Sequence, residues 1–188
     1  MMLETKRLVM RPFEEKDLQD FHEYAKDPKV GPPAGWKTHA TLEESKDILG
    51  NFMAGDEVFA LVEKASGKVV GSLGLHEDRK REYKGAKMVG YVLSSRYWGR
   101  GYMPEALEGL LAYAFETLQL NLVSAYHYPF NVQSQRVLEK AGFHFEGVLR
   151  ACSILVDGEI VDDRCYSMKR EEYFNIREAL LEQIDPSL

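Results

Sequence analysis

Apolar residues recur along the chain at two different spacings, and together these predict a mixture of strands and helices. Short apolar runs that stop at turn residues predict strands at residues 7–11, 57–64, 68–76, 87–94, 122–127, 148–156 and 159–168. Apolar residues at helical spacing predict helices at residues 17–25, 41–55, 104–118, 132–141 and 171–184. Thr41 and Glu44 form a capping box, which marks the start of the second helix.

Turn sequences indicate how the strands connect. Ala65-Ser66-Gly67 lies between the second and third predicted strands, and Asp157-Gly158 lies between the last two, so both favour hairpins. A strand, a helix and a further strand lie between these hairpins. This order predicts an α/β (α+β) fold, with one domain built on a mixed, mostly antiparallel twisted sheet that is flanked by helices.

Length and composition narrow the class of protein. The 188 residues suit one domain over residues 1–188, with a core at about 4–173 and a C-terminal helix at about 171–184. Hydrophobic residues make up 45% and charged residues 29%, so a packed core is expected. The formal net charge of −6 argues against a nucleic-acid partner. The longest apolar run, Leu110 to Phe115, has six residues, and the N-terminal residues lack a signal-peptide pattern, so we expect a cytoplasmic protein without a membrane span.

One stretch carries candidate chemistry. Arg96-Tyr97-Trp98-Gly99-Arg100-Gly101-Tyr102 lies between a predicted strand and a predicted helix. Two glycines and a helix start direct several backbone N–H groups to one point, where the helix dipole favours an anion, and the two arginines add positive charge. This pattern is typical of a pyrophosphate site, and a tight turn with solvated arginines is the alternative. Pro104 argues against a Rossmann fingerprint, and Gly101-Tyr102-Met103 argues against a Walker loop.

Four pieces of the sequence resemble the GNAT acyltransferase superfamily, in particular its branch of ribosomal-protein alanine N-acetyltransferases. They are ETKRLVMRPFEEKDL, MVGYVL, RYWGRGY followed by PEAL, and NVQSQRVLEKAGF, and the resemblance runs from about Glu4 to Tyr173. It implies acetyl-CoA as the donor, with its pyrophosphate on the amides of Gly99 to Met103. It also implies splayed central strands, with the pantetheine along the strand that ends at Leu93-Ser94 and a backbone N–H near Leu93 on the thioester oxygen.

The same resemblance points to Asn131 and Ser134. Many family members carry a tyrosine acid seven residues after the asparagine, but this chain has Leu138 there, so Ser134 is left as the hydroxyl that protonates the leaving thiolate. Asn131 would bind the pantetheine or hold the helix start. Helix capping by both residues is the alternative, and it is compatible with these roles.

The general base has no direct candidate. Related enzymes often place a glutamate just before the Gly-Tyr pair of the central strand, but residues 87–91 contain no carboxylate. Glu77, Asp78 and His127 lie at neighbouring strand ends and could act through a water molecule, although each is also explained as a solvated strand-end residue. Weak assistance is tolerable, because a thiolate is a good leaving group.

Other features receive simpler interpretations. Trp36, in a loop rich in Gly and Pro, either lines the acceptor pocket or anchors its loop. The charged run from Arg79 to Lys84 is expected to be a solvated loop. Histidines and cysteines lack ligand spacing, so no metal is expected, and Cys152 and Cys165 are expected to be reduced core thiols.

The sequence therefore predicts an N-acetyltransferase that moves acetyl from acetyl-CoA to a primary amine of a small molecule or a protein N-terminus by direct attack. The alternatives are a non-catalytic acyl-CoA-binding or sensing module and a nucleotide-binding protein. The net charge of −6 suits a cationic amine, although bulk charge is weak evidence about a pocket. The C-terminal hairpin and helix could pair with a second copy of the chain to form a homodimer.

Overall fold

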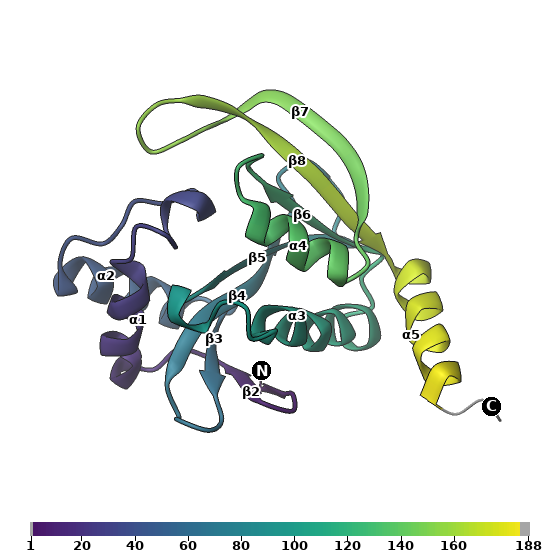
Figure 1. Ribbon diagram of the computed structural model, residues 1–188, viewed down its shortest axis with the longest axis horizontal. Helices are drawn as coiled ribbons and strands as arrows, with labels where there is room; N and C mark the ends of the chain where they lie inside the picture. Colours follow the sequence, from purple (N-terminus) through teal and green to yellow (C-terminus); the bar gives the residue numbers. More distant parts are fainter. Residues whose placement is uncertain (1, 185–188) are drawn as a thin grey trace.

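The computed structural model of the chain describes residues 2–184 and contains one sheet of eight strands. The strands are β1 (Leu3–Glu4), β2 (Leu8–Arg11), β3 (Val58–Glu63), β4 (Val69–Glu77), β5 (Ala86–Leu93), β6 (Leu122–His127), β7 (His144–Ile154) and β8 (Ile160–Lys169). They lie in the order β1-β2-β3-β4-β5-β6-β8-β7, and each neighbouring pair is antiparallel except β5 and β6, which are parallel (Figure 1). The predicted mixed, mostly antiparallel sheet is confirmed.

Within the same residues, five α-helices flank the sheet: α1 (Leu18–Ala25), α2 (Leu42–Ala54), α3 (Tyr102–Ala112), α4 (Val132–Lys140) and α5 (Arg170–Ile184). Helix α2 begins after the predicted cap Thr41, whose Oγ1 accepts a hydrogen bond from the Glu44 N–H, whereas the Glu44 carboxylate accepts from the Ala40 N–H instead of the Thr41 N–H of a full capping box. Helix α3 continues as a π-helical segment, Tyr113–Thr117. Over residues 2–184, none of these helices has both the length and the apolar character needed to cross a membrane.

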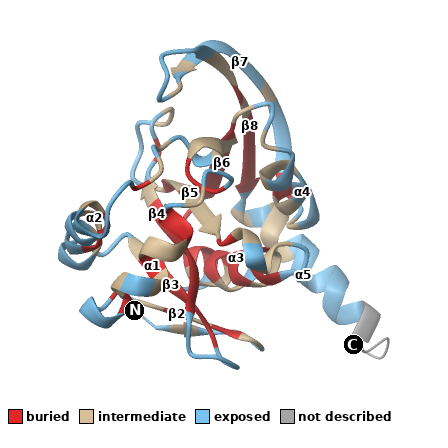
Figure 2. Ribbon diagram, turned by 60° about the vertical axis from the view of Figure 1, so that its left-hand side comes forward, coloured by how far each residue is buried: buried red, intermediate tan, exposed pale blue. Residues whose placement is uncertain are grey.

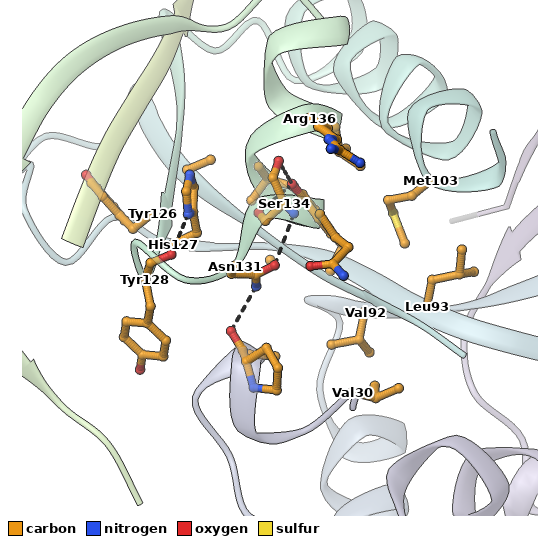
Figure 3. Close-up of a pocket in the computed structure, with 18 of the residues that line it drawn as sticks. Val30, Val92, Leu93, Met103, Tyr126, His127, Tyr128, Asn131, Ser134 and Arg136 are labelled. Carbon is orange, nitrogen blue, oxygen red and sulfur yellow. Dashed lines mark hydrogen bonds between the residues drawn. The ribbon is translucent and has the colours of Figure 1, made fainter. Parts of the chain in front are cut away.

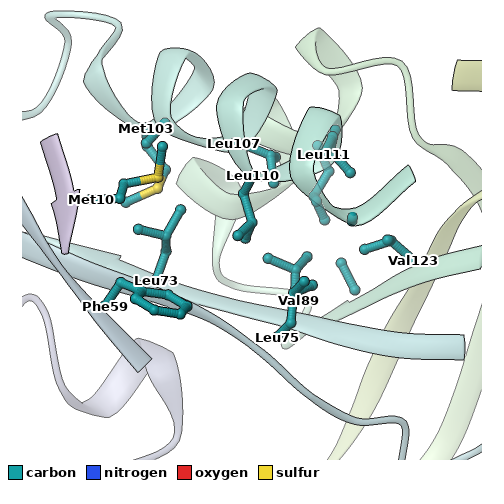
Figure 4. Close-up of a cluster of buried hydrophobic side chains, with 14 of the residues drawn as sticks. Met10, Phe59, Leu73, Leu75, Val89, Met103, Leu107, Leu110, Leu111 and Val123 are labelled. Atoms are coloured by element: carbon teal, nitrogen blue, oxygen red, sulfur yellow. The ribbon is translucent and has the colours of Figure 1, made fainter. Parts of the chain in front are cut away.

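Each face of the sheet is covered by its own helices. The alternation along β3 shows the division: Phe59 and Leu61 belong to the core beneath α3 and α4, whereas Ala60 and Val62 belong to the core beneath α1 and α2. Figure 4 shows Leu107 and other apolar residues of α3 packed on the first of these faces. Both β7 and α5 stay largely exposed (Figure 2).

Strand β7 begins at His144 rather than at residue 148 as predicted. It lies at the edge of the sheet and none of its residues is buried, so apolar alternation does not mark its start. Pairing with β8 fixes it instead, with His144 opposite Ser167. Cys165 is buried in β8, but Cys152 is exposed in β7, so the prediction that both thiols lie in the core is wrong for Cys152.

Strands β5 and β6 pair over a short distance. Their register covers three residue pairs, from Ala86–Leu122 to Met88–Ser124, and it ends there. Both strands then continue to their ends without pairing to each other. The predicted splay of the central strands is therefore present, and it leaves two facing backbone edges open to a ligand.

Gly71 on β4 allows the end of β5 to approach closely. A Cβ atom at this position would lie 2.3 Å from the Val92 carbonyl oxygen and 3.0 Å from the Leu93 Cα. Gly71→Ala should therefore lower the free energy of unfolding in urea by about 1–3 kcal/mol. Gly50→Ala is the control, because a Cβ atom there meets nothing within 4 Å. In the interior of α2 this change should stabilise the fold by up to about 1 kcal/mol, and equal stability of Gly71→Ala and the parent would contradict the close approach.

Candidate active site

A cavity of about 550 Å³ lies where β5 and β6 part. Its walls are β5, the end of β6, the starts of α3 and α4, and the loop after α1. In Figure 3, Met103 and Leu93 lie on one side, Tyr126 and Tyr128 on the other, and Ser134 between them. The two sides are named here the glycine-loop end and the tyrosine end.

The glycine loop joins β5 to α3 and contains Gly99 and Gly101, both with a φ of +75°. Residues with a Cβ atom rarely adopt this conformation, so the two glycines permit the sharp reversal before the helix. Gly99, Gly101, Tyr102 and Met103 line the cavity. Within the described residues, no acceptor takes up the backbone N–H groups of 99–103. This end therefore offers free N–H donors together with the positive end of the α3 dipole.

An ion pair from the N-terminal hairpin holds the glycine loop. Glu105, in the first turn of α3, accepts hydrogen bonds from the backbone N–H (2.7 Å) and Nε (2.6 Å) of Arg7 and from the Thr5 hydroxyl (2.6 Å). The Arg7 guanidinium also donates to the Arg100 carbonyl at 2.8 Å and lies 4.5 Å from the centre of the Tyr102 ring. Burial alone would raise the pKa of Glu105, but these donors hold the pKa below its ordinary value. The loop is thus fixed by charges from a distant part of the sequence.

The predicted loop arginines point away from the cavity. Arg96 pairs with Glu23 of α1, and the Arg100 guanidinium lies over the Tyr97 ring. Among the described residues that line the cavity, neither arginine is found. The cations that do line it include Arg136, drawn beside Met103 in Figure 3, and two lysines, Lys29 and Lys140.

The end of β5 presents a backbone donor to the cavity. The Ser94 N–H donates to the Val70 carbonyl of β4 at 2.8 Å, so by strand alternation the Leu93 N–H points the other way, toward β6. Leu93 lines the cavity, whereas Ser94 is buried outside the lining. The Leu93 carbonyl accepts a hydrogen bond from Trp98 Nε1 at 2.8 Å, which leaves its N–H as the group that a ligand can reach.

The start of α4 brings Asn131 and Ser134 to the middle of the cavity. Asn131 caps the helix, since its Oδ1 accepts from the Ser134 N–H at 3.1 Å, and its Nδ2 donates to the Pro33 carbonyl at 2.9 Å. The Ser134 hydroxyl lies 2.9 Å from that of Tyr91 on β5, a residue to which the sequence analysis gave no role. Burial raises the pKa of Tyr91, so its phenol stays protonated and can donate to Ser134 Oγ. The Ser134 proton is then free for another acceptor.

Two of the three candidates for the general base, Glu77 and Asp78, do not line the cavity. Glu77 is 78% exposed, pairs with Lys87 and is outside the lining. Burial alone would raise the pKa of Asp78, but hydrogen bonds hold the pKa below its ordinary value. Asp78 therefore acts as a structural anchor, and its four donors are Ser124 Oγ, Tyr126 Oη, Arg81 Nη1 and the Lys80 N–H.

His127, the third candidate, lines the cavity at the tyrosine end (Figure 3). Its Nδ1 lies 2.8 Å from the Tyr128 carbonyl oxygen, which can only accept, so Nδ1 carries the proton. Nε2 then carries a lone pair; it is buried and has no hydrogen-bond partner in the part of the chain that is described. Burial lowers the pKa of His127, which favours the neutral imidazole. A neutral imidazole with a free lone pair at a cavity wall is a proton acceptor.

The loop between α1 and α2 covers the tyrosine end without Trp36. Trp36 packs on His39, with 5.3 Å between ring centroids, and lies outside the cavity lining, so it anchors its loop. The loop lines the cavity with Pro33, Ala34 and Gly35 instead. A Cβ atom on Gly35 would lie 2.8 Å from the Tyr128 hydroxyl, which shows how closely the loop meets the end of β6.

The charged run after β4 is a loop and is exposed at residues 82–84, as predicted, but its first three residues, Arg79, Lys80 and Arg81, form ion pairs. Arg81 donates to both oxygens of Glu146 at 2.6 Å, in addition to its bond with Asp78. Arg79 lines the cavity and donates to Asp163 of β8 at 3.1 Å. The run therefore joins the end of β4 to β7 and β8, and it supplies part of the tyrosine end.

Sequence comparison assigns a family to this site. The acetyltransferase (GNAT) domain model matches residues 7–144. The chain is 31% identical over 179 residues to the uncharacterized N-acetyltransferase YnaD of Bacillus subtilis (strain 168), covering 92% of this chain and 99% of that protein. It is 24% identical over 170 residues, 84% of each protein, to the [ribosomal protein uS5]-alanine N-acetyltransferase of Escherichia coli (strain K12).

The fold agrees with this assignment. A crystal structure of a GNAT-family acetyltransferase from Bacillus anthracis matches with a TM-score of 0.83 at 27% identity, covering 92% of this chain and 100% of that chain. The splayed strands and the glycine loop before α3 lie within the residues that the family model matches. The chain therefore belongs to the GNAT family and is an N-acetyltransferase.

Proposed function

We propose that the chain transfers the acetyl group of acetyl-CoA to a primary amine by direct attack, without a covalent enzyme intermediate. The observation that carries the proposal is the cavity between β5 and β6, with free N–H donors at the glycine-loop end and the lone pair of His127 at the tyrosine end. A donor that enters from one end and an acceptor from the other would meet beside Ser134.

The glycine-loop end suits CoA. The backbone N–H groups of residues 99–103, including that of Arg100, can bind the pyrophosphate together with the α3 dipole. The pantetheine amides can pair with the open edge of β5 up to Leu93, as an added strand would, while Asn131 holds the start of α4 beside this arm. The side chains of Ser94 and Arg96 do not line the cavity, so this proposal assigns the phosphate cations to Lys29, Arg136 and Lys140 instead.

Each step of the transfer has a residue suited to it. The amine nitrogen bonds to the carbonyl carbon of the thioester, and the Leu93 N–H stabilises the charge that develops on the oxygen. His127 Nε2 accepts the proton that the nitrogen loses. The carbon–sulfur bond breaks, and the Ser134 hydroxyl, which accepts from Tyr91, donates to the leaving sulfur. The Ser134 hydroxyl keeps its proton, the thiolate takes up one proton from solvent, and the His127 imidazolium releases one proton to solvent, so the products are the acetylated amine and the free thiol of CoA.

The first test follows thiol release from acetyl-CoA in the presence of a library of primary amines, with products identified by mass spectrometry. Binding of CoA is measured separately by calorimetry. We expect release that depends on the amine, together with an acetylated product. CoA binding without release from any amine would instead support the sensing module, and a protein that does not bind CoA would contradict both functions.

Ser134→Ala should lower kcat by about 10- to 100-fold, because a hydrogen bond to a charged sulfur contributes about 1.5–3 kcal/mol. The Kd for CoA should not change, since the α4 cap uses the Ser134 backbone N–H, which alanine keeps. Gln135→Ala, at a neighbouring position outside the lining, is the control. An unchanged kcat in Ser134→Ala would restrict Ser134 to its capping role.

His127→Gln should lower kcat at neutral pH by about 100-fold, because a positioned base contributes at least that much. Only the neutral imidazole accepts a proton, and burial lowers its pKa from the ordinary 6.5, so kcat of the parent should stay level down to about pH 6.5 and fall below it. The variant should lack this acidic limb. His144→Gln, at an exposed position outside the cavity, is the control. An identical acidic limb in His127→Gln and the parent would exclude His127 as the base.

A further inference from the structure

The charges on the cavity wall are mostly positive, although the chain has a formal net charge of −6. Among the described residues, five charged side chains line the cavity, and one of them is an anion: Lys29, Arg79, Arg136, Lys140 and Asp163. Arg136 lies at the glycine-loop end, and Lys140 follows one turn later on α4. Arg79 instead lies 5.2 Å from the centre of the Tyr126 ring, so it belongs to the tyrosine end.

The anion, Asp163, is already fully bonded. Its side chain is 1% exposed, and its Oδ2 accepts from Arg79 Nη2 at 3.1 Å and from Lys80 Nζ at 3.2 Å. Its Oδ1 accepts from Ser153 Oγ at 2.8 Å. One carboxylate thus faces two cations, and the group keeps a net positive charge. Because 49% of the Arg79 side chain remains exposed, its guanidinium is the charge that an acceptor meets at this end.

The carboxylates of Asp78 and Glu146, which the same charged loop contacts, already accept hydrogen bonds from other side chains. Asp78 accepts from Ser124 and Arg81, among other donors, and Glu146 accepts from Arg81 and Ser167. Among the described residues of this wall, a polyamine or another cationic acceptor would therefore meet no unpaired carboxylate, and its extra ammonium groups would be repelled by the guanidinium. The local charges favour an acceptor with a negative group.

We infer that the acceptor is a small amine of the amino-acid class, and that Arg79 binds its carboxylate. A guanidinium matches a carboxylate with two parallel hydrogen bonds, which fixes orientation as well as affinity. The loop that contains Gly35 lies close to the Tyr128 hydroxyl and so covers part of this end of the cavity, which favours a small acceptor over the terminus of a folded protein. The inference rests on the proposed function, and it reverses the expectation drawn from the net charge.

The test uses pairs of primary amines that differ in one carboxylate, such as 4-aminobutyrate with butylamine, and α-amino acids with their amides. Values of kcat/KM come from thiol release at saturating acetyl-CoA. The carboxylate-bearing member of a pair should be preferred by about 10-fold or more, as expected for a charged hydrogen-bonded pair. Arg79→Gln should lower kcat/KM for that member by about 10- to 100-fold and leave both the member without a carboxylate and the Kd for CoA unaffected.

Two further variants separate recognition from folding. Lys80→Gln removes the other cation on Asp163, but Lys80 does not line the cavity, so this variant should keep the preference. Arg79→Lys keeps the charge without the planar fork and should keep part of the preference. Thermal unfolding of each variant shows whether the fold is retained.

Several outcomes would overturn the inference. Equal kcat/KM values for the two members of each pair would contradict a carboxylate site at Arg79, and so would an equal loss for both members in Arg79→Gln. Neither result would contradict the proposed acetyl transfer. A preference for peptide termini over every small amine would exclude the amino-acid class. Acetylation of no amine at all would contradict the proposed function, and the inference would fall with it.

Discussion

The cavity of this protein exists because two neighbouring strands stop pairing in the middle of a sheet. Strands β5 and β6 share three residue pairs and then diverge, although buried backbone groups need hydrogen-bond partners. A side chain beside the gap meets part of this requirement, since Trp98 Nε1 donates to the Leu93 carbonyl. Asp78 in addition bonds two side-chain hydroxyls of β6. The Tyr91–Ser134 pair crosses the gap and joins β5 to α4. The strands are thus held apart by specific contacts, and the remaining open edge is where a ligand can bind.

The charge of the cavity lining is opposite in sign to the net charge of the chain. The protein is acidic overall, yet the charged side chains that line its cavity, within residues 2–184, are four cations and one bonded carboxylate. Electrostatic attraction at short range depends on the nearest unscreened groups, so a local excess of this kind outweighs the bulk charge for a molecule inside the cavity. The two ends of the cavity differ in the groups that supply the positive charge. At the glycine-loop end these include backbone N–H groups, whereas beside Tyr126 the charge comes from the Arg79 guanidinium.

Much of the fold could be predicted from the sequence, because helices and inner strands each bury a face and so carry a regular period. The glycine loop was equally visible, since Gly99 and Gly101 need a positive φ. The edge strand β7 was misplaced at its start because it buries no residue. Arg79 was missed for another reason: a charged run is typical of a solvated loop, and its partner Asp163 lies 84 residues away. Contacts between distant charges leave no periodic signal.

The hydrogen bonds between Glu105 and the N-terminal hairpin affect how the protein should be tagged for binding experiments. Arg7 and Thr5 hold the first turn of α3 from a hairpin whose outer strand, β1, has two residues. A disturbance of this short hairpin reaches the glycine loop through the Glu105 carboxylate and through the hydrogen bond from Arg7 to the Arg100 carbonyl. An affinity tag placed just before β1 would adjoin this hairpin, so recombinant protein for ligand-affinity work is better tagged on the C-terminal side of α5, which lies outside the cavity lining.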